Sequence, residues 1–134
     1  MANCYCGNSV SFEACCAPYI KGSQNPETAE ALMRSRYSAY ATGKADYLIE
    51  TTHISTRKFH LKSDILAWSK NNQWLKLEVL ASTETTVKFN AYFLDENLKA
   101  QIHKEYSFFK LENGNWFYVD GEYTGSGSNI RCSN

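Results

Sequence analysis

The chain has 134 residues, about the size of one domain, and its 43% hydrophobic and 14% aromatic content is that of a folded globule rather than a disordered chain. Its 14 basic and 14 acidic residues balance to a net charge of zero, which argues against a nucleic-acid-binding face. No stretch approaches the roughly 20 apolar residues that span a bilayer, so we expect no membrane segment.

The first residues, Met1 to Cys4, include neither a basic region nor an apolar segment of the kind found in signal peptides. We therefore expect a cytoplasmic protein whose thiols stay reduced. In that compartment, clustered cysteines more often bind a metal than form disulfides.

Four of the five cysteines form two close pairs, Cys4-x-Cys6 and Cys15-Cys16. Four thiolates from such pairs can converge on one tetrahedral ion, and Gly7 allows the backbone to turn tightly around it. Because four sulfur ligands leave no position for water, the pattern predicts a structural zinc ion (Zn2+) rather than a catalytic one. Disulfides formed by air oxidation and buried free thiols are the alternatives. A redox role is disfavoured because neither pair has the Cys-x-x-Cys spacing.

A long helix is predicted after a linker at residues 21–26. Asn25 can cap this helix and Pro26 suits its first position, and Gly43 ends it after Thr42. Its apolar positions recur at spacings of three and four and are Ala29, Leu32, Met33, Tyr37 and Tyr40.

Two short helices and four strands follow. The helices are predicted over residues 45–51 and after Ser63, which can act as a cap. After Asn71-Asn72 the hydrophobic period changes to two, and Asn113-Gly114 is a strong hairpin signal. The predicted strands cover about 75–79, 87–93, 101–111 and 116–123. Helices first and an antiparallel meander afterwards favour an α+β fold, with N-terminal helices packed on a curved sheet.

Several motifs resemble known families. The segment from Cys4-Tyr-Cys6-Gly7-Asn8 to Cys15-Cys16 resembles the SEC-C motif, a zinc module also found at the end of the bacterial SecA motor. Beyond it, the chain resembles the bacterial YchJ-like family from residue 4 to about 124. The motifs that carry this resemblance are LMRSRYSAY at 32–40, Asp46-Tyr47-Leu48 with His53, Glu105-x-Ser107-x-Phe109, and Gly114-x-Trp116-x-Tyr118-x-Asp120-Gly121.

The resemblance implies a SEC-C head over residues 1–22 and a nuclear-transport-factor-2-like (SnoaL-like) cone over 23–124, and it implies no particular activity. The remaining residues, 125–134, are flexible by composition. Tyr5 and Asn8 replace the usual proline and serine, but neither is a ligand. Members commonly carry a second SEC-C motif at the C-terminus, whereas this chain has only Cys132 there, which we expect to be an exposed thiol.

A cone of this kind often holds a ligand, so its inward polar residues are the candidates for function. Glu105 and Ser107 share a strand face with Phe109, and Arg36 lies beside the apolar stripe of the long helix. His53 is the best group for chemistry near neutral pH. The full set of pocket candidates is Arg36, Tyr40, His53, Glu105, Ser107 and Asp120, the last on one face with Trp116 and Tyr118.

The favoured interpretation of these charges is structural, with Arg36 paired to Glu105 or Asp120. His60 and His103 carry no local signal. The tryptophans, Trp68, Trp74 and Trp116, are expected in the core or in the cone lining.

Two functions are therefore expected. The first is an interaction or scaffold module with a structural zinc site, which has a protein partner at the zinc head and a small-molecule ligand in the cone. The alternative is a small enzyme that uses Glu105, His53 and Arg36 on a small organic molecule. The fold alone does not decide between them, and the oligomeric state is left open.

Overall fold

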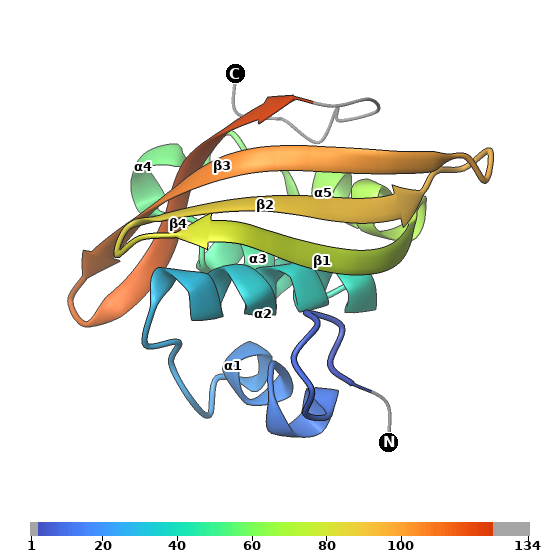
Figure 1. Cartoon of the computed structure of the whole chain (residues 1–134). Helices are drawn as coiled ribbons and strands as arrows, with labels where there is room; N and C mark the ends of the chain where they lie inside the picture. The colour runs from blue at the N-terminus through green and yellow to red at the C-terminus, as the bar shows by residue number, and fades with distance from the viewer. Residues whose placement is uncertain (1–2, 125–134) are drawn as a thin grey trace.

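The computed structural model describes residues 3–124 as helices followed by a four-stranded sheet (Figure 1). The tail with Cys132 lies outside the described residues. The helical elements are η1 (Phe12–Ala14), α1 (Ala17–Lys21), α2 (Ala29–Thr42), α3 (Ala45–Glu50), α4 (Ile54–Arg57) and α5 (Lys62–Lys70). The strands are β1 (Gln73–Ser82), β2 (Thr86–Leu94), β3 (Ala100–Glu112) and β4 (Asn115–Thr124), antiparallel in sequential order.

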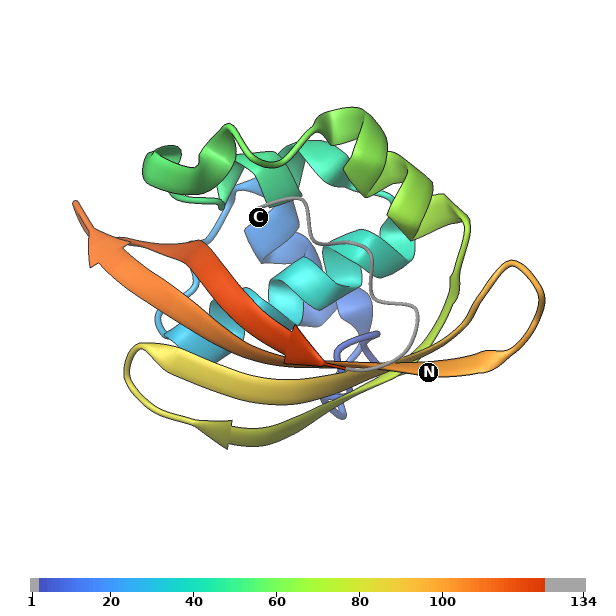
Figure 2. The same cartoon turned by 90° about the horizontal axis from the view of Figure 1, so that it is seen from above.

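The helices cover one face of a curved sheet, as the view from above shows (Figure 2). Helix α2 lies against the sheet, and the N-terminal head with η1 and α1 lies on the other side of α2 (Figure 1). This arrangement confirms the predicted α+β fold, in which helices pack on a curved antiparallel sheet after a small cysteine-bearing head.

Helix α2 begins later than the sequence predicts. The side-chain oxygen of Thr28 accepts a hydrogen bond from the backbone of Ala31 at 3.0 Å and caps the helix, so the predicted cap at Asn25 is wrong. The predicted end is confirmed, because Gly43 adopts the left-handed conformation with φ of 74°.

Helix α2 is buried on nearly all sides because the head covers the flank opposite the sheet. Its buried residues therefore include three polar ones, Ser35, Arg36 and Ser38. The hydroxyl of Ser35 bonds to the Tyr47 hydroxyl of α3 at 2.6 Å and donates to the backbone oxygen of Leu32. These bonds satisfy polar groups that would otherwise destabilise a buried helix.

Two short helices and one helix start were missed. Helices α1 and α4, of five and four residues, are too short to carry a periodic apolar pattern. Helix α5 starts at Lys62, with Leu61 rather than Ser63 at its N-cap position.

Bulges interrupt the alternation of β1. Trp74 pairs with Phe93 and Lys76 with Tyr92, so Leu75 is an extra residue and is 54% exposed. Leu75 therefore does not share the inner face with the buried Leu77, although the period of two would place both on one face. A single inserted residue shifts the face to which every following side chain points.

A bulge in β4 has the same effect. Phe108 pairs with Asp120 and Phe109 with Tyr118, which leaves Val119 as the extra residue. The backbone of Tyr118 also bonds the segment before α4, at Thr51 and His53, at 2.8 Å each. The predicted hairpin is confirmed, because Asn113 and Gly114 both have positive φ values of 54° and 81°.

The hydrophobic core is continuous from the head into the cone. Cys4, Cys6 and Cys16 belong to the same buried cluster as Leu32 of α2 and Leu77 of β1. Trp68 packs edge-on against both Trp74 and Phe93, and Trp116 of β4 packs against the core cluster, as expected for core or lining residues. The core thus joins two parts that the sequence divides near residue 22.

Candidate functional site

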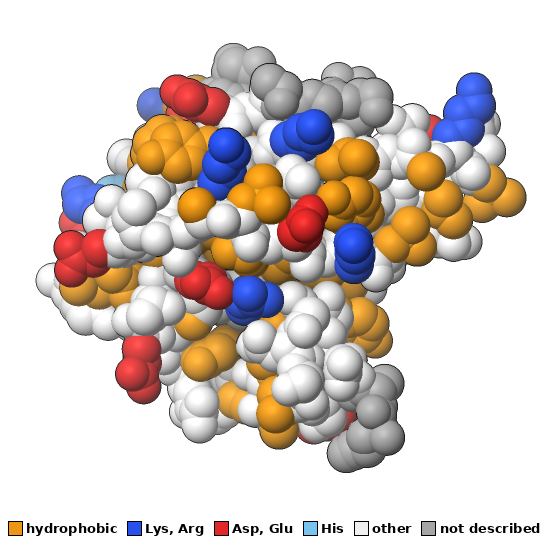
Figure 3. Space-filling model, viewed as in Figure 1, with side chains coloured by type: hydrophobic (Ala, Val, Ile, Leu, Met, Phe, Trp, Pro, Cys, Tyr) orange, Lys and Arg blue, Asp and Glu red, His pale blue; other side chains and the backbone are white. Residues whose placement is uncertain are grey.

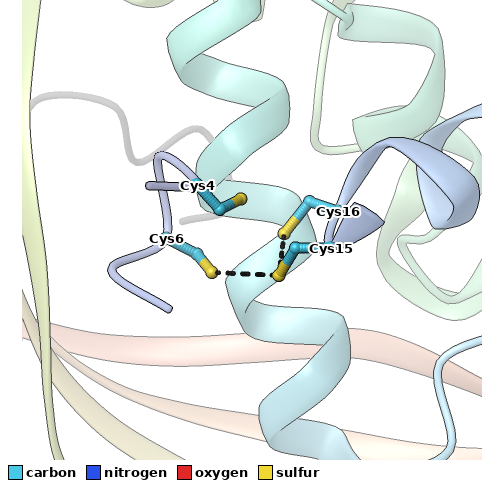
Figure 4. A group of neighbouring side chains, drawn as sticks. All are labelled: Cys4, Cys6, Cys15 and Cys16. Carbon is cyan, nitrogen blue, oxygen red and sulfur yellow. Dashed lines mark hydrogen bonds between the residues drawn. The ribbon is translucent and has the colours of Figure 1, made fainter. Parts of the chain in front are cut away.

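The four cysteines of the head point toward a common centre (Figure 4). All four are free thiols, and their sulfur atoms lie within 4.8 Å of one another. Cys6 and Cys15 are 3.7 Å apart at Sγ, and Cys15 and Cys16 are 3.9 Å apart. These separations are far longer than the roughly 2.05 Å of a disulfide bond.

The sulfur spacing fits a tetrahedral ion. A zinc–sulfur bond of about 2.3 Å places the ligand atoms of a tetrahedron about 3.8 Å apart, which is close to the two separations. The contact between Cys6 and Cys16 lowers the pKa of Cys6 to about 5 although burial opposes this shift, and the same contact, together with burial, raises the pKa of Cys16. These residues therefore fit zinc by donor type, number and spacing.

Short backbone contacts shape the loop that carries Cys4 and Cys6. Gly7, with φ of 98°, donates its backbone N–H to the oxygen of Cys4 at 3.0 Å and closes the turn. The amide of Asn8 donates to Sγ of Cys15 at 3.3 Å. Such bonds to ligand atoms orient the sulfurs before an ion binds.

Helix α2 anchors the head to the cone. Nη1 of Arg34 donates to the backbone oxygen of Cys6 at 2.8 Å, and its Nε donates to Glu30 at 3.0 Å. The other carboxylate oxygen of Glu30 accepts from Ser82 of β1 at 2.9 Å. Sγ of Cys4 lies 3.6 Å from the hydroxyl of Ser38. The cysteine loop, α2 and β1 are therefore joined by one chain of polar contacts.

A second cluster of polar residues lies on the sheet side of α2. A cavity of about 50 Å³ lies between this helix and the inner face of the sheet. Arg36, 6% exposed, lines it and donates from Nη1 to the oxygen of Leu48 and to the hydroxyls of Thr51 and Thr52. Its guanidinium carbon lies 4.5 Å from the ring centre of Tyr118.

Glu105 is the centre of the polar network in the cavity. Its Oε1 lies 2.7 Å from Nε2 of His103, and its Oε2 accepts from Ser107 at 2.6 Å and from Tyr118 at 2.8 Å. Burial alone would raise the pKa of Glu105, but these donors outweigh it and hold the pKa below the ordinary value. The carboxyl group is therefore ionised at neutral pH. Burial and the adjacent carboxylate raise the pKa of Tyr118, which stays a donor.

The profile of the family described as "YchJ, middle NTF2-like domain" matches residues 28–121. The chain belongs to the YchJ-like family. It is 36% identical to a UPF0225 protein of Serratia proteamaculans, over 96% of this chain and 88% of that protein. It is equally similar to the UPF0225 protein YchJ of Shigella dysenteriae, with 36% identity and the same two coverages.

Two solved structures share the fold of this YchJ-like chain. A SEC-C motif containing protein from Rhodopseudomonas palustris superposes with a TM-score of 0.83 at 35% identity, over 90% of this chain and 98% of that one. A second SEC-C motif containing protein, from Psychrobacter arcticus, gives 0.73 at 26% identity, over 90% and 81%. In the described residues, no helix is long and apolar enough to cross a membrane.

The YchJ-like cavity brings together four of the six candidates, Arg36, Tyr40, Glu105 and Ser107. His53 is not among them. It caps α4 and contacts Glu112 at 2.8 Å, and Glu112 lies seven residues from Glu105, about 23 Å along a strand. The predicted convergence of His53 with Glu105 is therefore wrong.

Asp120 also lies away from the cavity. The bulge at Val119 reverses the phase of β4, so Gly121 pairs with Ser107 on the inner face and Asp120 pairs with Phe108 on the outer one. The prediction that Asp120 shares a face with Tyr118 is wrong. Among residues 3–124, no carboxylate forms an ion pair with Arg36, so its predicted pairing with Glu105 or Asp120 is wrong as well.

Three residues in or beside the cavity were not predicted as part of it. His103 is buried and bonds Glu105, and His60 lines the cavity. The signal for His103 was available, because residues 103, 105, 107 and 109 share one strand face by the period of two. Gly121, the last residue of the Gly114-x-Trp116-x-Tyr118-x-Asp120-Gly121 motif, borders the Glu105 carboxylate so closely that a Cβ there would collide with it.

Proposed function

We propose that this YchJ-like chain binds one structural zinc ion through Cys4, Cys6, Cys15 and Cys16, and that it acts as a protein-interaction or scaffold module. The observation that carries the zinc proposal is the convergence of four free sulfurs within 4.8 Å. Four sulfur ligands close the coordination sphere, so the ion would stabilise the head and perform no chemistry.

The proposed ion would also stabilise the core. Cys4, Cys6 and Cys16 are buried in the cluster that continues into the cone, and Phe12 and Ile20 of the head pack against it. Structural zinc contributes about 10–16 kcal/mol of apparent binding free energy in small zinc modules. Because thiolate ligands need reduced cysteines, we also propose a cytoplasmic location.

The interaction role rests on the surface of the head. Tyr5 and Val10 are exposed by 50% and 48%, and Tyr5 packs edge-on against Phe12 with ring centres 5.3 Å apart. A zinc-fixed loop that presents apolar side chains suits a protein partner with an apolar patch. On the face drawn in Figure 3, basic and acidic side chains are interspersed, which supports a partner other than nucleic acid.

The enzyme alternative draws less support from the geometry. Its acid–base group, His53, contacts Glu112 at the end of β3, seven residues from Glu105. The cavity of about 50 Å³ is also much smaller than the roughly 300 Å³ of common substrate pockets.

Elemental analysis combined with native mass spectrometry tests the zinc proposal. Protein purified under reducing conditions should carry one zinc per chain, and Cys6→Ser should lose it. Cys132→Ser is the matched control, because Cys132 is outside the four-cysteine set, and it should keep one equivalent. Full zinc content in Cys6→Ser, or none in the unchanged protein, would contradict the proposal.

Site-specific crosslinking tests the interaction surface. A photoreactive residue at Tyr5 or Val10 should give one defined adduct in the producing cell, whereas the same residue at Lys88 on the sheet should not. The adduct should disappear when the other head position is changed to serine. Equal crosslinking from all three positions would contradict a partner site on the head.

A further inference from the structure

The cavity on the sheet side of α2 holds two buried charges that do not neutralise each other directly. Met33, Arg36 and Tyr40 face it at helical spacing, whereas Arg34 and Ser38 of the same helix contact the zinc head. The cavity is therefore separate from the cysteine cluster. Its other wall is the inner face of β2, β3 and β4, through Phe89, Glu105, Ser107, Tyr118 and Tyr123.

The guanidinium of Arg36 keeps donors available. All hydrogen bonds that the described residues accept from it start at Nη1, and they end at one backbone oxygen and two hydroxyls. A guanidinium has five N–H groups, of which Nη1 carries two. The N–H groups of Nε and Nη2 therefore have no acceptor among residues 3–124.

The carboxylate of Glu105 keeps one acceptor position. A carboxylate offers about four lone-pair sites. His103, Ser107 and Tyr118 use three of them, two at Oε2 and one at Oε1. One site at Oε1 remains on a side chain that is 9% exposed and lines the cavity.

A buried polar atom beside the cavity also lacks a partner. Nδ1 of His103 is buried and has no hydrogen-bond partner among the described residues. Its ring packs against Phe89 and Tyr123, which both line the cavity, with ring centres 6.3 and 4.9 Å away. Buried polar atoms are almost always satisfied in folded proteins, so this nitrogen is an exception, and it lies directly behind the part of the cavity wall formed by Phe89 and Tyr123.

We propose that this cavity binds a small uncharged carbonyl compound that carries a neighbouring hydroxyl or N–H group. The carbonyl oxygen accepts from the Nε and Nη2 groups of Arg36, and the donor group bonds Oε1 of Glu105. An anion would meet the charge of Glu105 and a cation that of Arg36, so a neutral guest fits best. This ligand site goes beyond the proposed role of the zinc head and does not depend on it.

The size of the cavity limits the guest. A volume of about 50 Å³ is far below the roughly 300 Å³ of common ligand pockets, so the guest has only a few non-hydrogen atoms. Even an efficient ligand of about five non-hydrogen atoms binds in the micromolar to millimolar range. Hydroxyacetone has a carbonyl beside a hydroxyl and is a suitable probe, and acetone is its counterpart without the donor.

Nuclear magnetic resonance of the labelled, zinc-loaded full chain tests the proposal. Hydroxyacetone should shift the Nε–H signal of Arg36 and the ring signals of His103 in a saturable way. Acetone should bind at least about tenfold more weakly, because it leaves the open site of Glu105 unfilled. Glycolate, which keeps the hydroxyl but is an anion, should also bind more weakly. Equal affinities for hydroxyacetone and acetone, or no saturable shift up to about 100 mM, would overturn the proposal.

Single-residue variants test whether hydroxyacetone binding depends on the residues of the cavity. Glu105→Gln should weaken hydroxyacetone binding at least about tenfold, and Glu112→Gln should leave it unchanged. Glu112 is the matched control because it also bonds a buried histidine, His53, but lies away from the cavity. If Glu105→Gln does not fold, Ser107→Thr is tested in its place. The threonine keeps the hydroxyl group and adds a methyl group that fills the cavity. Unchanged affinity in a folded Glu105→Gln or Ser107→Thr variant would overturn the proposal.

Discussion

Nη1 of Arg34 lies 2.8 Å from the backbone oxygen of Cys6, so a side chain of the central helix holds the loop that carries two of the four proposed zinc ligands. The same guanidinium bonds Glu30, which accepts from Ser82 of β1. The position of the cysteine loop is thus fixed by α2 and the sheet, and the proposed zinc ion would fix it further.

Arg34→Met should loosen the metal site without removing a ligand. Loss of a charge-assisted bond to Cys6 should cost about 1.5–3 kcal/mol of unfolding free energy and speed zinc release. A chromophoric chelator measures the release rate, and urea unfolding measures the free energy. Lys21→Met is the control, because Lys21 is an exposed basic residue of the head. Equal release rates in the two variants would contradict the anchoring role.

Removal of the metal should affect the whole chain. The sequence divides the chain near residue 22, which would let the cone melt separately from the head. The shared core predicts otherwise, because Cys4, Cys6 and Cys16 pack in one cluster with Leu32 and Leu77. Cys6→Ser, or chelation, should lower the midpoint of a single calorimetric transition. Two separate transitions would show that head and cone fold independently.

The stability of the cone should depend on pH through Glu105. Its pKa lies below the ordinary value of 4.5. Burial alone would raise this pKa, but the hydrogen bonds to the carboxylate, of which the one from His103 is the strongest, outweigh burial. A carboxyl group whose pKa is lower in the folded state than in the unfolded state stabilises the fold at pH values above its unfolded-state pKa. This contribution is lost as the pH falls through the folded-state pKa. The stability difference between the unchanged protein and Glu105→Gln should therefore be largest near neutral pH and shrink below about pH 4.5.

Urea unfolding at a series of pH values measures this difference. Glu112→Gln provides the comparison, because the Glu112 side chain is 42% exposed and its contribution is screened by solvent. A constant difference across the series would mean that Glu105 does not titrate as its contacts indicate.

Gly121→Ala should disturb the cavity directly. The added Cβ would collide with Oε2 of Glu105 and lie 2.9 Å from the Tyr118 hydroxyl. We expect a loss of about 1–3 kcal/mol of unfolding free energy, as for other overpacked cores. Glu105→Asp shortens the opposing side chain, so the double variant should be more stable than the sum of the two single changes predicts. Additive losses would show that the two residues do not compete for space.

Much of the sheet could be predicted because its period is regular. Val87, Phe89, Ala91 and Phe93 are all buried, as their alternation with polar residues indicates. The hairpin at Asn113-Gly114 was predictable for a similar reason, since its two positive φ values demand these residue types.

Parts of the site could not be predicted because they depend on irregular backbone. The bulge at Val119, where β4 bonds the segment before α4, moved Asp120 to the outer face. No alternation rule anticipates a bulge that is set by a neighbouring segment.

The position of His53 was predicted wrongly because its role is local. Its ring nitrogen accepts a hydrogen bond from the backbone of Ser55 and caps α4.

The burial of α2 on both flanks has a consequence for the order in which the chain assembles. During synthesis the head and α2 leave the ribosome before any strand of the sheet. At that stage α2 can cover only the flank that bears Arg34 and Ser38, against the cysteine loop, while the flank that bears Met33 and Arg36 waits for β2, β3 and β4. A zinc ion taken up early would hold half of the nascent domain in its final arrangement, and the last hairpin, β3–β4, would then close the cavity over the buried arginine.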